Sequence, residues 1–324
     1  MSKQDCCSPM GQKSEEAQFL RNEINRLKKE KNAIIMAHYY QRDEVQEIAD
    51  RIGDSLALAQ MAAETDADII VMCGVHFMGE TAKILCPEKK VLIPDPEAGC
   101  SLADSCPAHE FEEFVKAHPD HTVISYVNTS AAVKALTDIV VTSGNARKVV
   151  DSLPADEKII FGPDKNLGGY INSVTGRDML LWDGACHVHD RFSLEGILAL
   201  KKEHPDAKVL VHPECRKPLQ LIADKVGSTA ALLQYARTEQ ASEFIVVTES
   251  GILREMRLAC PEKNFMAAPA DDAECQCNMC EYMKLGTLRK VYEALLHESP
   301  EVTVDPQIAE KALRPIERML ELSK

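Results

Sequence analysis

The chain carries three copies of one pattern, in which an apolar run ends in polar residues and a hydroxyl residue follows at a fixed distance. The copies are AIIMAHYY with GDSLALAQ (33–40 and 53–60), TVISYVNT with TSGNARKV (122–129 and 142–149), and KVLVHPEC with GSTAALLQ (208–215 and 227–234). The spacing is 17 residues from His38 to Ser55, from Tyr126 to Ser143 and from His212 to Thr229. Self-similarity at a fixed period indicates a repeated architecture. Polar groups at equivalent strand ends of three related units are therefore expected to meet at one site.

The two outer copies agree in more detail than the middle one. IADRIGDSLALAQ (48–60) matches IADKVGSTAALLQ (222–234), and CPEK (86–89) matches CPEK (260–263) at the same offset of 174 residues. The middle copy keeps mainly its strand and its hydroxyl positions. An ancient duplication without a shared site is the alternative explanation of the repeat.

Composition narrows the class of protein. Of 324 residues, 45% are hydrophobic, which supports real cores, and three units of roughly 90 residues fill most of that length. The net charge of −14 argues against nucleic acid or an anionic membrane as a partner. No apolar run is long enough for a membrane span, and residues 1–16 lack the apolar core of a signal peptide. The sequence predicts a soluble, cytoplasmic protein.

Each unit is expected to contain, in order, a strand, a helix, a short strand, a helix and a strand. The runs IIVMCG (69–74), KIIFGP (158–163) and FIVVTE (244–249) suit strands that are buried on both faces of a parallel sheet. Helical spacing follows the short strands at 56–64, 146–153 and 230–237. This alternation predicts an α/β fold of three homologous, three-layer αβα domains with short parallel sheets. Ligands of such sheets bind beyond the carboxyl ends of the strands.

The predicted boundaries follow the repeat. They are an N-terminal tail and helix (1–32, with the helix at about 14–30), three α/β repeats (33–120, 121–206 and 207–290), and C-terminal helices packing on the core (291–324, with helices at about 284–297 and 305–323). The residues at the carboxyl ends of the first strands are His38, Tyr40, Tyr126, Asn128, His212 and Glu214.

The 12 cysteines are many for a reducing compartment, where cysteines are more often buried, metal-binding or catalytic than disulfide-bonded. Three cysteine segments fall late in the three units: AGCSLADSC (98–106), DGACHVHD (183–190) and ECQCNMC (274–280). Cys100 precedes Cys186 by 86 residues, and Cys186 precedes Cys280 by 94. One thiolate per unit would supply the three ligands of a [4Fe–4S] cluster whose fourth iron stays open to substrate as a Lewis acid.

The sequence leaves open which metal the cysteines bind and which of them are ligands. Zinc is the main rival, because CxxC pairs and histidines such as His187 and His189 are common zinc ligands. Cys106 competes with Cys100, because the offset of 174 aligns Cys106 with Cys280. The remaining assignments are core for Cys73, Cys86 and Cys260, and a polar tail for Cys6 and Cys7.

Many motifs of the chain resemble those of quinolinate synthases. They are AHYYQRDEVQEIAD, CGVHFMGETAKIL, PDPEAGCSLADSC, SYVNTSAAVKA, VVTSGNA, GPDKNLGGYI, GACHVHDRF, VHPEC, GSTAALL and CNMCEYMK, between about residues 33 and 290. The resemblance implies three α/β domains in a pseudo-threefold arrangement around a central active site. It also implies a transferase that condenses iminoaspartate (iminosuccinate) with dihydroxyacetone phosphate to quinolinate, phosphate and water in de novo NAD biosynthesis. A possible partner is the enzyme that produces iminoaspartate.

The same resemblance assigns residues. It implies that Cys100, Cys186 and Cys280 hold a [4Fe–4S] cluster. The implied substrate-binding residues are His38, Ser55, Tyr126, Val127, Asn128, Ser143, His189, His212, Pro213, Glu214 and Thr229. The implied catalytic residues are Glu214, Tyr40 and His212. Some family members carry CxxCxxC where this chain has CxCxxC, so the choice of Cys280 over Cys277 depends on the CNMCEYM context.

Chemical roles can be suggested for several of these side chains. Glu214 is the candidate base, with a pKa raised by burial toward working pH. His38 and His212 are candidate donors to substrate carboxylates, and Tyr40 is either a general acid or base or a residue that orders a domain closure.

The three repeated hydroxyl residues are expected to open helices, where unpaired backbone N–H groups attract anions. Ser143, followed by Gly144, is the predicted phosphate site, and Cys277 and Cys280 are a predicted disulfide in cluster-free protein. The competing functions are a [4Fe–4S] hydro-lyase of the aconitase type and a non-catalytic redox sensor.

Overall fold

The computed structural model of the chain describes residues 15–271 and 278–324, and within them the fold is α/β with three four-stranded parallel sheets. The first sheet holds β1 (Ala33–His38), β2 (Arg51–Gly53), β3 (Ile69–Cys73) and β4 (Lys90–Leu92). The second holds β5 (Thr122–Tyr126), β6 (Ile139–Val141), β7 (Ile159–Phe161) and β8 (Leu180–Leu181). The third holds β9 (Lys208–Val211), β10 (Lys225–Val226), β11 (Glu243–Val247) and β12 (Asn264–Ala267).

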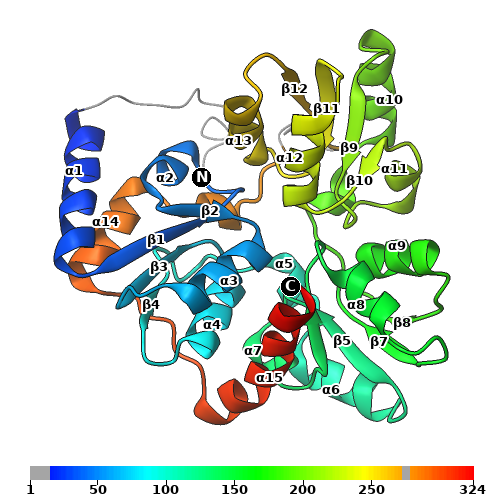
Figure 1. Cartoon of the computed structure of the whole chain (residues 1–324), viewed down its shortest axis with the longest axis horizontal. Coiled ribbons are helices and arrows are strands. Elements are labelled where there is room, and N and C mark those ends of the chain that lie inside the picture. Colours follow the sequence, from blue (N-terminus) through cyan, green and yellow to red (C-terminus); the bar gives the residue numbers. More distant parts are fainter. Residues whose placement is uncertain (1–14, 272–277) are drawn as a thin grey trace.

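The three sheets have one topology. Their strand orders are β2-β1-β3-β4, β6-β5-β7-β8 and β10-β9-β11-β12, and neighbouring strands pair in parallel throughout. Figure 1 shows them as three groups, blue to cyan, green, and yellow-green, set around the middle of the molecule. The predicted fold class is therefore confirmed, while the pseudo-threefold arrangement stays a prediction.

Helices cross over between the strands of each sheet. In the first unit they are α2 (Asp43–Ile48), α3 (Ser55–Glu64) and α4 (His76–Leu85), followed by the short α5 (Ser101–Asp104). In the second they are α7 (Ala131–Lys134), α8 (Ala146–Ser152) and α9 (Lys165–Thr175). In the third they are α11 (Lys217–Leu221), α12 (Thr229–Thr238) and α13 (Ile252–Ala259). Two 3-10 turns, η1 (His189–Arg191) and η2 (Tyr282–Lys284), lie near the predicted cysteine ligands.

A further helix comes before each sheet and packs on it. These helices are α1 (Glu15–Glu30), α6 (Ala108–Lys116) and α10 (Leu194–Glu203). Phe111 of α6 is buried with Val123 and Ile160 of the second sheet, although α6 falls in the range predicted for the first unit. Ile197 of α10 is likewise buried with Val209 of the third sheet. The structural unit therefore begins one helix earlier than the sequence pattern that revealed it.

The same side-chain-to-backbone hydrogen bond occurs at equivalent positions in all three units. A carboxylate just before the second strand accepts the backbone N–H of a residue in the first strand, at 2.8 or 2.9 Å. The carboxylates belong to Asp50, Asp138 and Asp224, and the N–H groups to Ile35, Val123 and Val209. Satisfying the same strand N–H in the same way helps each short sheet to keep its register.

The C-terminal helices join the units. Helix α14 (Leu288–His297) packs against α1 and β3, and α15 (Pro306–Leu322) packs against β6, α7 and α4. Helix α14 begins later than predicted because the Thr287 side chain accepts the backbone N–H of Lys290 and so caps the helix there. No helix among the described residues is long and apolar enough to cross a membrane.

Candidate active site

A cavity lies where the carboxyl ends of the three sheets meet, with about 720 Å³ of empty space counted out to its open mouth. Of the predicted site residues, those that line it are His38, Tyr40, Ser55, Cys100, Tyr126, Val127, Asn128, Ser143, Cys186, His189, His212, Glu214, Thr229 and Cys280. Pro213 is not among the lining residues, and its carbonyl accepts a hydrogen bond from Gln220 Nε2. The structure thus brings the predicted residues of all three units together, and their individual roles stay predictions.

The two strand-end histidines are held in one tautomer. Nδ1 of His38 accepts the backbone N–H of Tyr40 at 3.1 Å, and Nδ1 of His212 accepts that of Glu214 at 3.3 Å. The proton of each neutral ring is therefore on Nε2, which for His212 lies 3.2 Å from Ser143 Oγ. Burial lowers the pKa of both rings to about 3. Both side chains are hence neutral N–H donors at the cavity wall.

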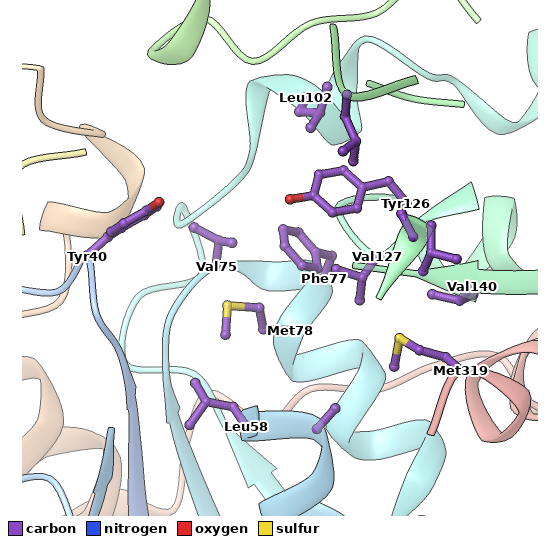
Figure 2. Close-up of a cluster of buried hydrophobic side chains, with 14 of the residues drawn as sticks. Tyr40, Leu58, Val75, Phe77, Met78, Leu102, Tyr126, Val127, Val140 and Met319 are labelled. Carbon is purple, nitrogen blue, oxygen red and sulfur yellow. The ribbon is translucent and has the colours of Figure 1, made fainter. Parts of the chain in front are cut away.

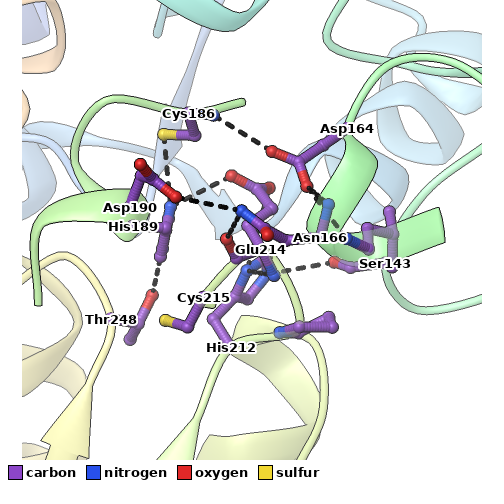
Figure 3. Close-up of polar contacts among 12 residues, drawn as sticks. Ser143, Asp164, Asn166, Cys186, His189, Asp190, His212, Glu214, Cys215 and Thr248 are labelled. Carbon is purple, nitrogen blue, oxygen red and sulfur yellow. Dashed lines mark hydrogen bonds and ion pairs between the residues drawn. The ribbon is translucent and has the colours of Figure 1, made fainter. Parts of the chain in front are cut away.

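Glu214 is buried and contacts two donors, of which Figure 3 shows His189. Tyr126 donates its hydroxyl to Oε1 at 2.6 Å, and Oε2 lies 3.0 Å from His189 Nδ1. Burial disfavours the charged carboxylate, but the imidazoles of His189 and His212 and the two hydrogen bonds outweigh it and lower the pKa of Glu214 to about 2. The prediction that burial raises this pKa toward working pH is therefore wrong for this state, because the sequence did not show these partners.

Tyr40 lies opposite Tyr126, and Figure 2 shows their hydroxyl ends pointing toward one another. The Tyr40 hydroxyl is 2.7 Å from the hydroxyl oxygens of both Thr229 and Thr248. Thr248 Oγ1 is also 2.9 Å from His189 Nε2. Burial raises the pKa of both tyrosines well above the usual value, so both are neutral phenols. Hydrogen bonds thus connect the two phenols through residues of the second and third units.

The three repeated hydroxyl residues do not occupy equivalent places. Ser55 and Thr229 are the first residues of α3 and α12, but the side chains of Asp54 and Ser228 cap those helices. Ser143 lies in the turn before α8 rather than at its start, which corrects the prediction for the middle unit. Within that turn, Asn145 Oδ1 accepts the backbone N–H of Thr142 at 2.6 Å. In all three units, the predicted hydroxyl is left free of helix capping and lines the cavity.

The three predicted cluster ligands face one space. Burial raises the pKa of Cys100 to about 12, of Cys280 to about 11, and of Cys186 well above the usual value. Cys280 adds to the rise at Cys100, and both of these thiols add to the rise at Cys186. Cys106, the rival of Cys100, is instead buried beside Phe111 and does not line the cavity. Cys73, Cys86 and Cys260 are buried as predicted, whereas Cys6, Cys7, Cys275 and Cys277 lie outside the described residues.

Two buried carboxylates hold the backbone beside the cysteines, and the sequence analysis missed both. Asp164 Oδ2 accepts the backbone N–H of Cys186 at 3.0 Å, and Glu249 Oε1 accepts that of Cys280 at 3.1 Å. By strand register they follow β7 and β11 at equivalent places, where the first unit has Val75. The sequence signal that locates them is an acidic residue at equivalent positions after the third strands of the second and third units.

The cavity has no positively charged side chain on its wall, since none of the described residues that line it is Lys or Arg. Anions would have to be held by histidine and hydroxyl groups and by backbone N–H groups. Asn128 adds a buried Oδ1 that has no hydrogen-bond partner. A buried polar atom without a partner costs free energy, so this oxygen is suited to accept a hydrogen bond from a bound molecule.

Comparisons with known proteins identify relatives over nearly the whole chain. Residues 22–321 match the family model described as "Quinolinate synthetase A protein". The chain is 55% identical over 300 residues to the quinolinate synthase of Synechocystis sp., which covers 93% of this chain and 94% of the relative. It is 54% identical over 302 residues to that of Chloroherpeton thalassium, with 93% and 94% covered. The quinolinate synthase of Cyanophora paradoxa is 53% identical over 302 residues, with 93% and 92% covered.

Proposed function

The chain belongs to the quinolinate synthase family, and from that premise we propose that it condenses iminoaspartate with dihydroxyacetone phosphate to form quinolinate, phosphate and water. The observation that carries the proposal is the meeting of one cysteine and one polar strand end from each unit at a single cavity. The activity is that of a transferase in de novo NAD biosynthesis, located in the cytoplasm. Its partners are the two small substrates and the enzyme that supplies iminoaspartate.

The residues present fit a [4Fe–4S] cluster held by Cys100, Cys186 and Cys280. Three partly buried thiols that face one cavity, each with a raised pKa, are costly to ionise alone, and a cationic iron cluster relieves that cost. When bound, the cluster supplies an open iron that acts as a Lewis acid on carboxylate or hydroxyl groups. Asp164 and Glu249 fix the backbone of two of the three ligand loops.

The protein's own groups then bind and orient the substrates. The Nε2–H groups of His38 and His212 donate to substrate carboxylates, which the neutral rings do without carrying charge. Ser143 binds the phosphate, and Ser55 and Thr229 add hydroxyl groups from the helix starts. The side chains of Val127 and Asn128 complete the wall of the middle unit, and Pro213 acts only through the shape of its loop.

Glu214 is the proposed proton acceptor. Substrate that enters between Glu214 and His189 removes the interactions that lower the pKa of the carboxyl, while burial, which raises it, remains. Tyr40 and Tyr126 stay protonated and donate to substrate oxygens across the cavity. Closing the site around two substrates excludes water, which strengthens each of these hydrogen bonds.

An anaerobic assay tests the proposal. Protein purified without oxygen is given both substrates, and quinolinate, phosphate and consumed triose phosphate are measured together with bound iron. We expect equal amounts of quinolinate and phosphate and about four irons per chain. Turnover of a hydroxy acid without any consumption of triose phosphate would contradict the synthase and support an aconitase-type hydro-lyase. Cys100→Ser should lose the cluster and Cys106→Ser should keep it, and the reverse result would overturn the ligand assignment.

A further inference from the structure

A second set of metal ligands overlaps the proposed cluster site. Ligand atoms of Cys186, His189 and Glu214 all lie within 4.8 Å of one another. His189 Nδ1 is 3.0 Å from Glu214 Oε2 and 3.3 Å from Cys186 Sγ (Figure 3). Tetrahedral zinc with ordinary bond lengths separates such ligand atoms by roughly 3.3–3.6 Å. Two of the three separations therefore need to open by only a few tenths of an ångström to admit an ion.

Neighbouring groups already orient these ligands. His189 Nε2 is 2.9 Å from Thr248 Oγ1, which fixes the plane of the ring, and Glu214 Oε1 accepts the Tyr126 hydroxyl. Cys186 and His189 are joined by a tight turn, in which the backbone N–H of Asp190 donates to the Cys186 carbonyl at 2.9 Å. Metal-binding histidines usually donate their other ring nitrogen to such a partner, and ligating carboxylates are hydrogen-bonded in the same way.

We propose that the cluster-free chain binds one Zn²⁺ ion through the Cys186 thiolate, His189 Nδ1 and a Glu214 carboxylate oxygen. As the ion binds, the thiol proton leaves to solvent, the His189 ring keeps one proton, on Nε2, and the two anionic ligands balance the charge of the ion. Three protein ligands with a fourth position facing the cavity is a common zinc arrangement. Because Cys186 serves both sites, zinc and the cluster exclude one another, and zinc also occupies the proposed base. Zinc therefore holds the chain in an inactive, cluster-free form.

The experiment measures metal binding, so its outcome does not depend on the proposed activity. The starting protein carries Cys6, Cys7, Cys275 and Cys277 replaced by Ser, which removes the thiols outside the described residues. Cluster-free protein is prepared without oxygen and titrated with Zn²⁺ against a chromophoric chelator. Co²⁺ serves as the spectroscopic probe. We expect one ion per chain and, with Co²⁺, tetrahedral bands and a single-thiolate charge-transfer band.

Ligand variants locate the ion. Cys186→Ser and His189→Gln should lose tight binding, and Thr248→Val, which keeps all ligands, should weaken it by about 10–100-fold. Cys100→Ser and Cys280→Ser are matched controls and should bind zinc as the starting protein does. Unchanged affinity in both His189→Gln and Thr248→Val would overturn the site. Loss of binding in the two control variants would do so as well, since it would place the ion on the three cysteines.

Iron uptake gives a second readout. Cluster-free protein preloaded with one equivalent of Zn²⁺ should take up iron and sulfide much more slowly than zinc-free protein, and a chelator should restore the rate. Equal uptake with and without zinc would contradict mutual exclusion. If the chain instead binds zinc as proposed but forms no quinolinate when loaded with iron, the proposed function fails and the zinc site stands.

Discussion

The loop after the first strand of the middle unit differs from the loops at the same place in the two outer units, although all three are held in one way. In each unit, a side chain of the following helix donates to two loop carbonyls that lie two residues apart. The donors are Gln46 to Tyr39 and Gln41, Lys134 to Val127 and Thr129, and Gln220 to Pro213 and Cys215. The outer units use a neutral amide where the middle unit uses an ammonium group.

The comparison shows which part of the repeat is shared and which part is free to differ. The donor and its two carbonyls fix the path of the loop, and they keep the same spacing in all units. The cavity-facing residues vary: the first is His38, Tyr126 or His212, and the one two places later is Tyr40, Asn128 or Glu214. A common frame therefore presents a different set of chemical groups from each unit.

The middle unit bears a cost that the outer units do not. Lys134 is entirely buried, and burial lowers its pKa to about 8, opposed in part by Glu80 and Cys100. Its Nζ lies 5.4 Å from the centre of the Phe77 ring, which favours the charged form. Gln46 is nearly as buried, at 2% exposure, but carries no charge. The stability contributed by Gln46 and that contributed by Lys134 should therefore respond differently to substitution and to pH.

The largest expected effect is at the variable position of the third loop. Glu214→Gln gives that loop the amide group that the middle loop carries as Asn128, with almost no change of shape. We expect turnover to fall on the order of 10²–10⁴-fold, because the carboxylate that accepts the proton is lost. The measurement is anaerobic steady-state turnover with an iron count to show that the cluster is kept. Turnover within a factor of a few of the original would make Glu214 a positioning residue.

The next effect distinguishes the amide donor of the outer units from the ammonium donor of the middle unit by the loss of folding stability when each is removed. Gln46→Met leaves one buried and one partly buried carbonyl without a donor, and we expect the free energy of unfolding to fall by about 2–4 kcal/mol. Lys134→Met removes two donors as well but also removes a buried ammonium, so the loss should be smaller, about 0–2 kcal/mol at pH 7. Urea unfolding of both variants measures the difference. A larger loss in Lys134→Met would mean that burying the charge is not costly.

The strands and helices of the three units could largely be predicted from the sequence, because they come from repeated local patterns. The apolar runs ended at His38, Tyr126 and His212, where strands or their first loop residues lie, and buried parallel strands leave such runs. Unit boundaries were harder, because α6 and α10 pack on the sheet that follows them and their amphipathic pattern does not say which sheet they cover.

Features of the site that depend on contacts between units were not predictable. The pKa of Glu214 depends on Tyr126 and His189, which are 88 and 25 residues away in the chain and meet only in the folded cavity. Thr248 and Glu249 end the run FIVVTE (244–249), whose apolar pattern predicts a strand but not the contacts of these two residues. The choice between Cys100 and Cys106 likewise depends on which thiol faces the cavity, and a spacing argument aligned the wrong one of the two with that face.

A smaller effect is expected on the pH dependence of stability. The pKa of Lys134 is lowered from 10.5 to about 8, so the unfolded chain keeps a proton between these values that the folded chain has lost. The burial cost is fully present below about pH 8 and is relieved as the pH rises through the window, so stability rises there. Between pH 7 and pH 9, the original protein should gain about 1 kcal/mol relative to Lys134→Met. Parallel pH profiles of the two proteins would show that Lys134 does not titrate in this window.

The smallest effect is expected at the hydroxyl of the middle unit, which differs from the outer hydroxyls because it precedes its helix instead of opening it. Ser143 Oγ lies 3.2 Å from His212 Nε2, so hydroxyl and imidazole present one donor pair to an anion. Losing one hydrogen bond to bound phosphate costs about 0.5–1.5 kcal/mol. Ser143→Ala should therefore raise the KM for dihydroxyacetone phosphate about 3- to 10-fold and leave the KM for iminoaspartate nearly unchanged.

Ser55→Ala, which removes the equivalent hydroxyl of an outer unit, is the matched control for that experiment. It should not reproduce the selective rise in the KM for the triose phosphate if the phosphate binds at the middle unit. The bulkier Ser143→Val should block the phosphate site, because its branched side chain occupies the space beside His212. Equal KM changes for both substrates in Ser143→Ala, or bound phosphate beside Ser55 in a crystal, would place the anion in an outer unit. The middle hydroxyl would then only hold the His212 ring in place.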